Sequence, residues 1–467
     1  MNLQQQNIRM KKIYRLCSAI AAAAMITAAP LYATIDKTRH ATARHHTALA
    51  HHTGTGISRK VQAIYVDTLD LDSAEIDNGD NAADDDDAFS FSTIQDTLPW
   101  PQNIVERIND IFSKTTIFNT SAVGMMVYDL TADSVLYERD ARQLLRPAST
   151  LKMMVAVAAL DQLGTAYRLK TTVGYTGERD STALNGNIYC RGGFDPTVSN
   201  DDIADIADSI ASMGIDTIKG DICIDLTMKD RDRLGEGWCW DDKNPVLSPL
   251  LVDRKEEFGE RLKRKLRQKG ICVEGRCREE DMPGSAHLIY IKETPLTSVM
   301  HRQLKRSDNL YSEAVFYQIA SDGGRRSRAT ARHGRQAMNR LVSRLGFKPS
   351  AYYIADGSGL SLYNYVSAEL EVAFLRYAYS KKNIYAALHE CLPIAGVDGS
   401  LDERMRRGAA HDNVRAKTGT LTGISSLAGY CTAANGHVLC FSIINSGIRY
   451  TSSGRNFQDK VCQALCR

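Results

Sequence analysis

A strong net charge is absent from this 467-residue chain, because 58 Lys and Arg residues nearly balance 55 Asp and Glu residues and leave a formal charge of +3. So small a charge over this length does not indicate a polyanionic partner, and nucleic acid is not predicted as one. Hydrophobic residues at 43% and charged residues at 24% are ordinary for a globular protein. The length allows more than one domain, or one domain with a large insertion.

Long apolar runs are absent after residue 33, so the remainder of the chain is predicted to be soluble. The first 33 residues differ, because four basic residues between positions 9 and 15 precede the apolar run LCSAIAAAAMITAAPLYA, with small residues near Ala29 and Ala33. This pattern predicts a signal peptide over residues 1–33 and export to the periplasm or cell envelope. An uncleaved anchor helix is the alternative, since the run approaches the ~20 residues that span a bilayer.

Metal-ligand spacing is missing too, since the chain has no C-x-x-C pair and no Cys/His cluster of the kind that binds zinc. Neither a metal nor another cofactor is therefore predicted. Ten cysteines follow the predicted signal peptide, an even number in a compartment that permits disulfides. Spacing alone does not decide their connectivity. The candidate pairs that are close in sequence are Cys272 with Cys277, Cys431 with Cys440, and Cys462 with Cys466.

Residues 34–97 have the composition of a disordered linker. Through Lys60 this segment holds five histidines and five Lys or Arg residues, whereas residues 67–96 hold eleven Asp or Glu residues and no Lys or Arg. Such a segment buries too little apolar surface to fold alone. Metal binding by the histidines is the alternative to a solvated tether.

The pattern becomes globular from Leu98 onward and predicts an α+β fold. The segments SAVGMMVYDL and SVLYERD on either side of TAD read as a β-hairpin, and three strands are predicted near the end of the chain, followed by a helix. Short strands and Gly- and Asp-rich turns predict an inserted lobe over residues 171–290. One sheet is expected to take strands from both ends of a main domain, residues 98–170 and 291–467, with helices packed against it.

The stretch RPASTLKMMVAVAAL, residues 146–160, places Ser149 and Lys152 one helical turn apart at the start of an apolar helix. A lysine is almost never buried without a partner or a function, and a serine nucleophile needs a nearby base. With its ordinary pKa of ~10.4, a lysine is neutral in only about one molecule in 2,500 at pH 7, so burial or a second cation must suppress its charge. Alone, the pair is also compatible with a capping serine and a lysine that reaches the surface.

Two further motifs favour the catalytic interpretation. KRSDNLYSEAV supplies Ser307, Asp308 and Asn309 at a helix start, and VRAKTGTLTG supplies Lys417, Thr418, Gly419 and Thr420 at a strand edge. S-x-x-K, S-D-N and K-T-G together are the signature of penicillin-binding proteins and serine β-lactamases. The resemblance implies their α+β fold, with a central antiparallel sheet flanked by helices and, here, an inserted lobe.

Other stretches narrow the resemblance. DPTVSNDDIADIA, GWCWDD, DGSGLS, LPIAGVDGSL and RAKTGTLTGISSLAGY resemble the D-alanyl-D-alanine carboxypeptidase/endopeptidase family, peptidase S13, the class C low-molecular-mass penicillin-binding proteins. The resemblance covers roughly residues 98–467. The inserted segment is short for that family, and the linker before residue 98 has no counterpart in it.

The resemblance implies a serine D-Ala-D-Ala carboxypeptidase or endopeptidase that acts on peptidoglycan stem peptides. Ser149 would attack the carbonyl between the last two D-alanines and form an acyl-enzyme, and Lys152 would take the serine proton. Ser307 would relay a proton to the leaving amine, and Asn309 would hydrogen-bond the substrate backbone.

The K-T-G strand is expected to bind the end of the substrate. Lys417, with the hydroxyls of Thr418 and Thr420, would hold the terminal carboxylate and help to keep Lys152 neutral. Gly419 would allow close approach of the substrate to the strand. The N–H groups of Ser149 and Thr420 would form an oxyanion hole. β-Lactam antibiotics are expected as inhibitors, peripheral association with the envelope is allowed, and no cofactor is implied.

Three alternatives stay open. A β-lactamase shares the three motifs, but no E-x-x-L-N segment lies between Ser307 and Lys417 to supply the glutamate that class A enzymes use for deacylation. An esterase on the same scaffold is disfavoured by the K-T-G threonines, which suit a carboxylate-bearing substrate. A non-catalytic sensor that binds peptidoglycan or β-lactams is the third alternative, although all proposed catalytic side chains are present.

Overall fold

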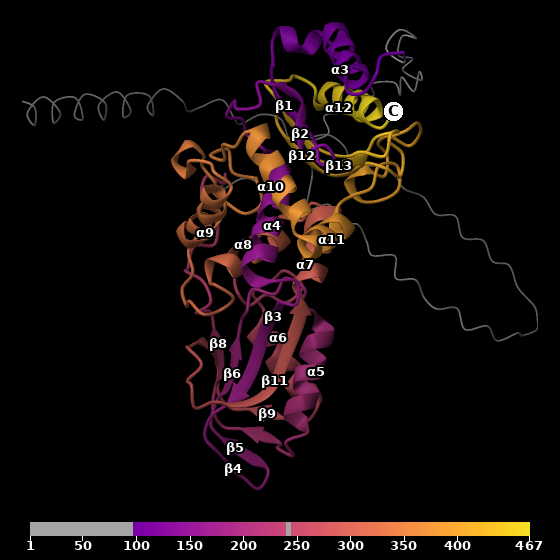
Figure 1. Ribbon diagram of the computed structural model, residues 1–467. Helices are drawn as coiled ribbons and strands as arrows, with labels where there is room; N and C mark the ends of the chain where they lie inside the picture. The colour runs from indigo at the N-terminus through magenta and orange to yellow at the C-terminus, as the bar shows by residue number, and fades with distance from the viewer. Residues whose placement is uncertain (1–96, 240–243) are drawn as a thin grey trace, which may run out of the picture. The chain divides into compact units, whose positions relative to one another are not determined.

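The computed structural model describes residues 97–239 and 244–467 (Figure 1). The predicted signal peptide, and the predicted linker except for Thr97, lie outside the described residues. Across the part of the chain that is described, no helix has both the length and the apolar character needed to cross a membrane.

A five-stranded sheet forms the centre of the main domain, in the order β12-β13-β14-β1-β2, and every neighbouring pair is antiparallel. Strands from the two ends of the described chain meet where β1 pairs with β14, from Ala122 opposite Ser446 to Asp129 opposite Leu439. The prediction of a central antiparallel sheet fed from both ends is therefore confirmed. Its strands are β1 (Ala122–Asp129), β2 (Ser134–Arg139), β12 (Arg415–Leu421), β13 (Ile424–Thr432) and β14 (Val438–Ser446).

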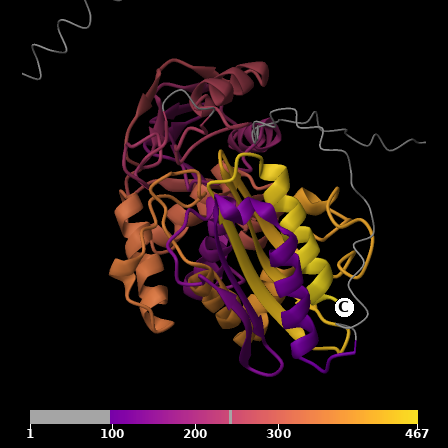
Figure 2. The ribbon, with the colours of Figure 1, turned by 90° about the horizontal axis from the view of Figure 1, so that it is seen from above.

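Helices cover both faces of this sheet. Along β13 and β14, alternate side chains enter two different apolar clusters, because successive residues of a strand point to opposite faces. One face packs against α3 (Gln102–Lys114) and α12 (Thr451–Leu465), which lie side by side in Figure 2. The other face packs against α10 (Ala368–Ser380) and the helices beyond it.

The helix α4 (Leu151–Leu163) is the buried central helix that the apolar run predicts. Its first ten residues are all buried, Lys152 included, and a short 3-10 turn, η2 (Ala148–Thr150), leads into it. Gly164, at φ 84°, ends the helix as expected. The helices packed against it are α7 (Leu296–Lys305), α8 (Asn309–Ala320), α9 (Ala331–Arg344), α10 and α11 (Lys382–Cys391).

The segment for which the sequence predicts an inserted lobe holds two further sheets. One has the order β10-β8-β6-β3-β11 and the other β4-β5-β7-β9, and together with α5 (Asn200–Ala211) and α6 (Phe258–Gln268) they enclose an apolar cluster of their own. The first strand of this segment, β3 (Arg168–Tyr175), pairs with the last, β11 (His287–Pro295), and these two strands connect to α4 and α7 in the chain. The remaining strands are β4 (Glu178–Asp180), β5 (Ala183–Asn185), β6 (Ile188–Arg191), β7 (Thr217–Ile218), β8 (Ile222–Asp225), β9 (Cys272–Val273) and β10 (Cys277–Glu279).

The cysteines do not pair as sequence proximity suggests. All ten cysteines within the described ranges are free thiols. Cys431 and Cys440 lie on neighbouring strands but enter the apolar clusters on opposite faces of the sheet, so this candidate pair is wrong. Cys272 and Cys277 belong to different sheets, on β9 and β10.

Candidate active site

Ser149 lies in the 3-10 turn η2 and contacts Lys152 one turn further along. The distance from Lys152 Nζ to Ser149 Oγ is 2.8 Å. The ammonium or amine group of Lys152 has two other neighbours, Asn309 Oδ1 at 2.8 Å and the carbonyl oxygen of Ser358 at 2.6 Å. The side chain of Lys152 is fully buried, so it does not reach the surface as the alternative reading of the motif requires.

Burial lowers the pKa of Lys152 to about 8, and the nearby carboxyl groups of Asp356, Glu313 and Asp308 act in the opposite direction. At pH 7, such a lysine is neutral in about one molecule in ten, compared with about one in 3,000 at the ordinary value of 10.5. A neutral amine has two N–H groups and one lone pair. With the two N–H groups directed at the Asn309 and Ser358 oxygens, the lone pair faces the Ser149 hydroxyl and can accept its proton.

The S-D-N segment is held at the start of α8. Ser307 has a left-handed backbone with φ 58°, and Asp308 caps the helix by accepting a hydrogen bond from the Tyr311 N–H. The carboxylate of Asp308 also pairs with the guanidinium groups of Arg254 and Arg302, each at 2.9 Å. These contacts fix the turn from which Ser307 and Asn309 point toward the two lysines.

The K-T-G strand β12 brings a second buried lysine to the site. Lys417 Nζ donates to Ser307 Oγ at 2.9 Å, and the residue has no exposed surface. The next side chain, Thr418, has its hydroxyl 2.6 Å from the hydroxyl of Ser400, in the 3-10 turn η4 (Gly399–Leu401). Ser400 was not among the predicted site residues, although it lies in the LPIAGVDGSL stretch that carries the family resemblance.

Gly419 allows β12 to lie directly against the turn that holds Ser149. A Cβ atom added there would lie 2.8 Å from the Pro147 carbonyl oxygen and 2.9 Å from the Ser149 nitrogen, and it would collide with the Ser426 hydroxyl. The sequence suggests this glycine for close approach of a substrate. The contact with the turn that holds Ser149 is an additional requirement that only the fold reveals.

The outer edge of β12 offers backbone donors next to Ser149. β12 is the edge strand of its sheet, and its Ala416 N–H points outward to the Pro393 carbonyl oxygen at 3.0 Å. Because N–H groups alternate along a strand, those of Thr418 and Thr420 point to the same outer edge. An extended peptide can therefore pair with this edge while its reacting carbonyl lies between β12 and Ser149.

The segment that begins at Asp356 supplies the carbonyl contact to Lys152. The buried carboxylate of Asp356 accepts hydrogen bonds from the Gly359 and Ser361 N–H groups and from the Trp238 indole, at 2.8–2.9 Å. Gly359 has φ 80°, and a Cβ atom there would collide with the Ala148 carbonyl. The DGSGLS motif therefore packs a tight turn against the segment that holds Ser149, a role that sequence reasoning did not assign to it.

The eight candidate site residues meet in one region through the contacts above. Hydrogen bonds join Lys152 with Ser149 and Asn309, and Lys417 with Ser307. Gly419 contacts the Ser149 turn, between Thr418 and Thr420 on the same strand. Within residues 97–239 and 244–467, no group of three or more His, Cys, Asp or Glu residues is arranged to hold a metal ion.

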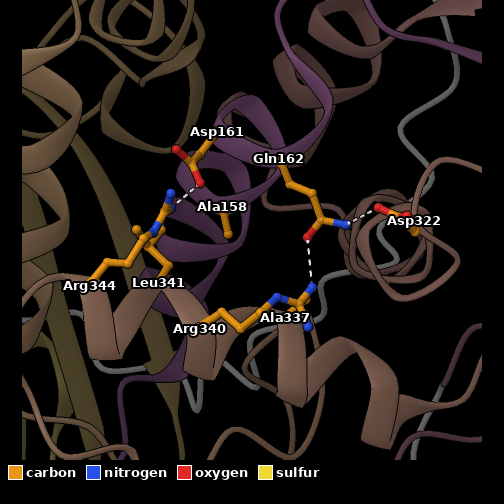
Figure 3. A pocket seen from close by; sticks show the side chains of 8 residues that line it. All are labelled: Ala158, Asp161, Gln162, Asp322, Ala337, Arg340, Leu341 and Arg344. Atoms are coloured by element: carbon orange, nitrogen blue, oxygen red, sulfur yellow. Dashed lines mark hydrogen bonds and ion pairs between the residues drawn. The ribbon is translucent and has the colours of Figure 1, made fainter.

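Two cavities lie elsewhere. One, of about 350 Å³, lies between the C-terminal half of α4 and α9 (Figure 3). Gln162 hydrogen-bonds to Arg340 and Asp322 there, and an ion pair between Asp161 and Arg344 joins the two helices. The other, of about 570 Å³, lies beside α7 and α11. Neither is lined by a residue of the three motifs.

Comparison with known proteins identifies one family. The model of the D-Ala-D-Ala carboxypeptidase 3 (S13) family matches residues 104–251 and 250–467. The D-alanyl-D-alanine carboxypeptidase DacB of Haemophilus influenzae is 24% identical over 430 residues, which cover 74% of this chain and 88% of that protein. The D-alanyl-D-alanine carboxypeptidase of Actinomadura sp. strain R39 is 26% identical, over 69% of this chain and 77% of that protein.

Solved structures give the same fold. The crystal structure of penicillin-binding protein 4 (dacB) from Haemophilus influenzae superposes with a TM-score of 0.67 at 22% identity, covering 77% of this chain and 98% of that one. The same protein complexed with a β-lactam superposes with a TM-score of 0.64 at 21% identity, covering 77% of this chain and 99% of that one. The predicted fold class is confirmed by these similarities.

Proposed function

This chain belongs to the D-Ala-D-Ala carboxypeptidase 3 (S13) family, and from that premise we propose that Ser149 is the nucleophile of a serine-type D-Ala-D-Ala peptidase acting on peptidoglycan. The observation that carries the proposal is the 2.8 Å contact between Ser149 Oγ and the fully buried amine of Lys152. Burying a lysine beside a serine hydroxyl costs free energy, and a role as the general base for that serine accounts for this cost. D-Ala-D-Ala carboxypeptidase activity is the activity for which the S13 family is named.

Acylation begins with proton transfer. Neutral Lys152 accepts the proton of Ser149 as Oγ forms a bond to the carbonyl carbon of the penultimate D-alanine. The carbonyl oxygen becomes an oxyanion, which the N–H groups of Ser149 and Thr420 stabilise, and a single donor of this kind typically contributes about 3–4 kcal/mol. The positive end of α4 adds to that stabilisation.

Departure of D-alanine completes the first half of the reaction. Its carboxylate is held by Lys417 with the hydroxyls of Thr418 and Thr420, and Ser400, which touches Thr418, orients that hydroxyl. The C–N bond breaks as Ser307 donates its proton to the leaving amine and takes up the proton that Lys152 accepted from Ser149, which leaves Lys152 neutral again. Ser307 suits this relay because its oxygen already accepts from Lys417 and its own hydrogen is available to donate.

Hydrolysis of the acyl-enzyme restores Ser149. A water molecule attacks the ester carbonyl while neutral Lys152 takes a proton from it, and the same donors stabilise the second oxyanion. Lys152 then passes that proton to Ser149 Oγ as the ester C–O bond breaks. Asn309 keeps the amine of Lys152 in place through both halves and hydrogen-bonds the substrate backbone with the other end of its amide. No metal or cofactor is required by these steps.

The substrates we propose are stem peptides that end in D-Ala-D-Ala, either free or joined in D-alanyl cross-links. β-Lactams are proposed as inhibitors that acylate Ser149, as a β-lactam complex is known for the Haemophilus influenzae relative. The site of action would be the periplasm or cell envelope, because residues 1–33 have the pattern of a signal peptide.

A labelling experiment followed by product analysis tests the proposal. Fluorescent penicillin should label the purified protein, and the Ser149→Ala variant should remain unlabelled. Incubation with purified muropeptides, cross-linked and uncross-linked, should then release D-alanine or separate cross-linked peptides. Labelling without any product would indicate a sensor, and rapid hydrolysis of the bound penicillin would indicate a β-lactamase.

A further inference from the structure

Glu313 is a buried carboxyl group for which the reaction above has no use. It lies on α8, one helical turn after Asn309, and only about 1% of its surface is exposed. Its Oε1 accepts hydrogen bonds from the backbone N–H groups of Gly357, at 3.0 Å, and Ser358, at 2.8 Å. The carboxyl group therefore holds the turn that follows Asp356.

That turn carries one of the oxygen atoms that contact Lys152. The carbonyl oxygen of Ser358 lies 2.6 Å from Lys152 Nζ, and the side-chain oxygen of Asn309 lies 2.8 Å away. Both acceptors are thus positioned from α8, Asn309 directly and the Ser358 carbonyl through Glu313. The lone pair of the neutral amine points at Ser149 only while both acceptors stay in place.

The charge of Glu313 affects Lys152, as do the hydrogen bonds that its carboxyl group accepts. Burial, together with the nearby carboxylate of Asp356, raises the pKa of Glu313 to about 8. At neutral pH the group is therefore mostly uncharged. An uncharged carboxyl group still has an oxygen that accepts both N–H bonds, but it no longer holds a proton on Lys152 by electrostatic attraction.

The other groups around Glu313 do not replace its electrostatic effect on Lys152. Lys152 faces it from α4 and Asp356 from the adjoining turn. Tyr317 lies one turn further along α8, where burial raises the pKa of the phenol and Glu313 adds to the effect. The packing helix α7 presents the neutral Gln303, which donates to the Lys152 carbonyl. The packing helix α9 presents Gly334, against the ring of Phe316.

We propose that Glu313 is a positioning residue for the general base: its uncharged carboxyl group fixes the Ser358 carbonyl against Lys152, and its ionisation increases the proton affinity of that amine. This inference rests on the proposed function, because it requires Lys152 to act as the base for Ser149. It also explains why a second carboxyl group beside Asp356 is buried next to the lysine that must lose its charge.

Two substitutions separate position from charge. Glu313→Gln keeps an oxygen that accepts the two N–H bonds and removes the ionisation, whereas Glu313→Leu removes both. The measurement is the second-order rate constant for acylation of Ser149 by fluorescent penicillin between pH 6 and pH 10. Glu293→Gln is the control, since it makes the same chemical change on β11, where Glu293 forms an ion pair with Lys170 of β3.

The two variants are expected to change the pH profile of acylation in different ways. For Glu313→Gln, the midpoint of the acid limb should fall by up to about 1 pH unit, and the rate at pH 7 should equal or exceed that of the wild type. For Glu313→Leu, the rate should fall at least about tenfold at every pH. Glu293→Gln should reproduce the wild-type profile.

Two results would overturn the inference: an unchanged midpoint in Glu313→Gln, or wild-type acylation by a folded Glu313→Leu protein. If Glu313→Leu does not fold, as judged by circular dichroism and thermal unfolding, the test is the pH midpoint of acylation in Glu313→Gln. Failure of the proposed function looks different, because then the wild type is not labelled or Ser149→Ala still is.

Discussion

The rate of Ser149 acylation should depend steeply on pH, because Lys152 must be neutral to act. With a pKa of about 8, the neutral fraction rises about ninefold from pH 6 to pH 7, about fivefold from pH 7 to pH 8, and less than twofold above that. A lysine with its ordinary value of 10.5 would instead give a tenfold rise in each of these intervals. The levelling near pH 8 is therefore the diagnostic feature.

Replacement of Lys152 by arginine tests the same reasoning without a change of pH. A guanidinium group stays ionised throughout this range, so it can fill part of the space but cannot take the serine proton. Loss of a general base typically lowers a rate by a factor of about 10²–10⁴, and the acylation rate of the Lys152→Arg variant should be reduced by a factor in this range. It should also lose the rise between pH 6 and pH 8.

The assay is stopped-flow acylation with a fluorescent penicillin, in buffers of constant ionic strength. Lys114→Arg, at an exposed ion pair on α3, is the matched control and should behave like the wild type. A flat profile between pH 6 and pH 9, or acylation of a folded Lys152→Arg protein within about threefold of the wild type, would show that Lys152 is not the base.

Three other outcomes are expected. Gly419→Ala should slow acylation at least about tenfold, because the new Cβ would lie 2.9 Å from the Ser149 nitrogen; labelling at the wild-type rate would contradict this. Burial of Lys152 lowers its folded-state pKa from 10.5 to about 8, which costs the folded protein about 3 kcal/mol below pH 8 and is relieved as pH rises to 10.5. The free energy of unfolding of the wild type relative to Lys152→Met, from urea titrations, should therefore rise between pH 8 and pH 10 and should not stay constant. On treatment with oxidised glutathione, Cys431 should join Cys466, whose thiol it contacts, and peptide mapping should leave Cys440 unlinked.

Local pattern was sufficient to predict the elements that carry Ser149 and the K-T-G motif. The apolar run after Ser149 predicts α4 because a helix that is apolar on all sides must be buried. The alternating segments near residues 122–139 and 415–446 predict strands for the same kind of reason, since successive side chains of a strand face opposite sides. The S13 resemblance then predicted which motifs come together.

Contacts between distant segments could not be predicted in this way. Glu313 lies next to the S-D-N motif in sequence, yet its partners lie 44 and 45 residues away at Gly357 and Ser358. Ser400 reaches Thr418 only because η4 packs against β12. The candidate Cys431–Cys440 pair failed for a related reason: proximity in sequence indicates neighbouring strands but not which face each thiol occupies.

The site concentrates several costs to stability in a small volume. Ala148 and Ser307 have left-handed backbones at φ 50° and 58°, and Lys152 and Glu313 are ionisable groups without exposure to water. The surrounding helices α4, α8 and α10 offset these costs with apolar burial. The same burial lowers the pKa of Lys152, so a substitution that admits water beside it should raise that pKa and slow acylation at neutral pH even if Ser149 stays in place.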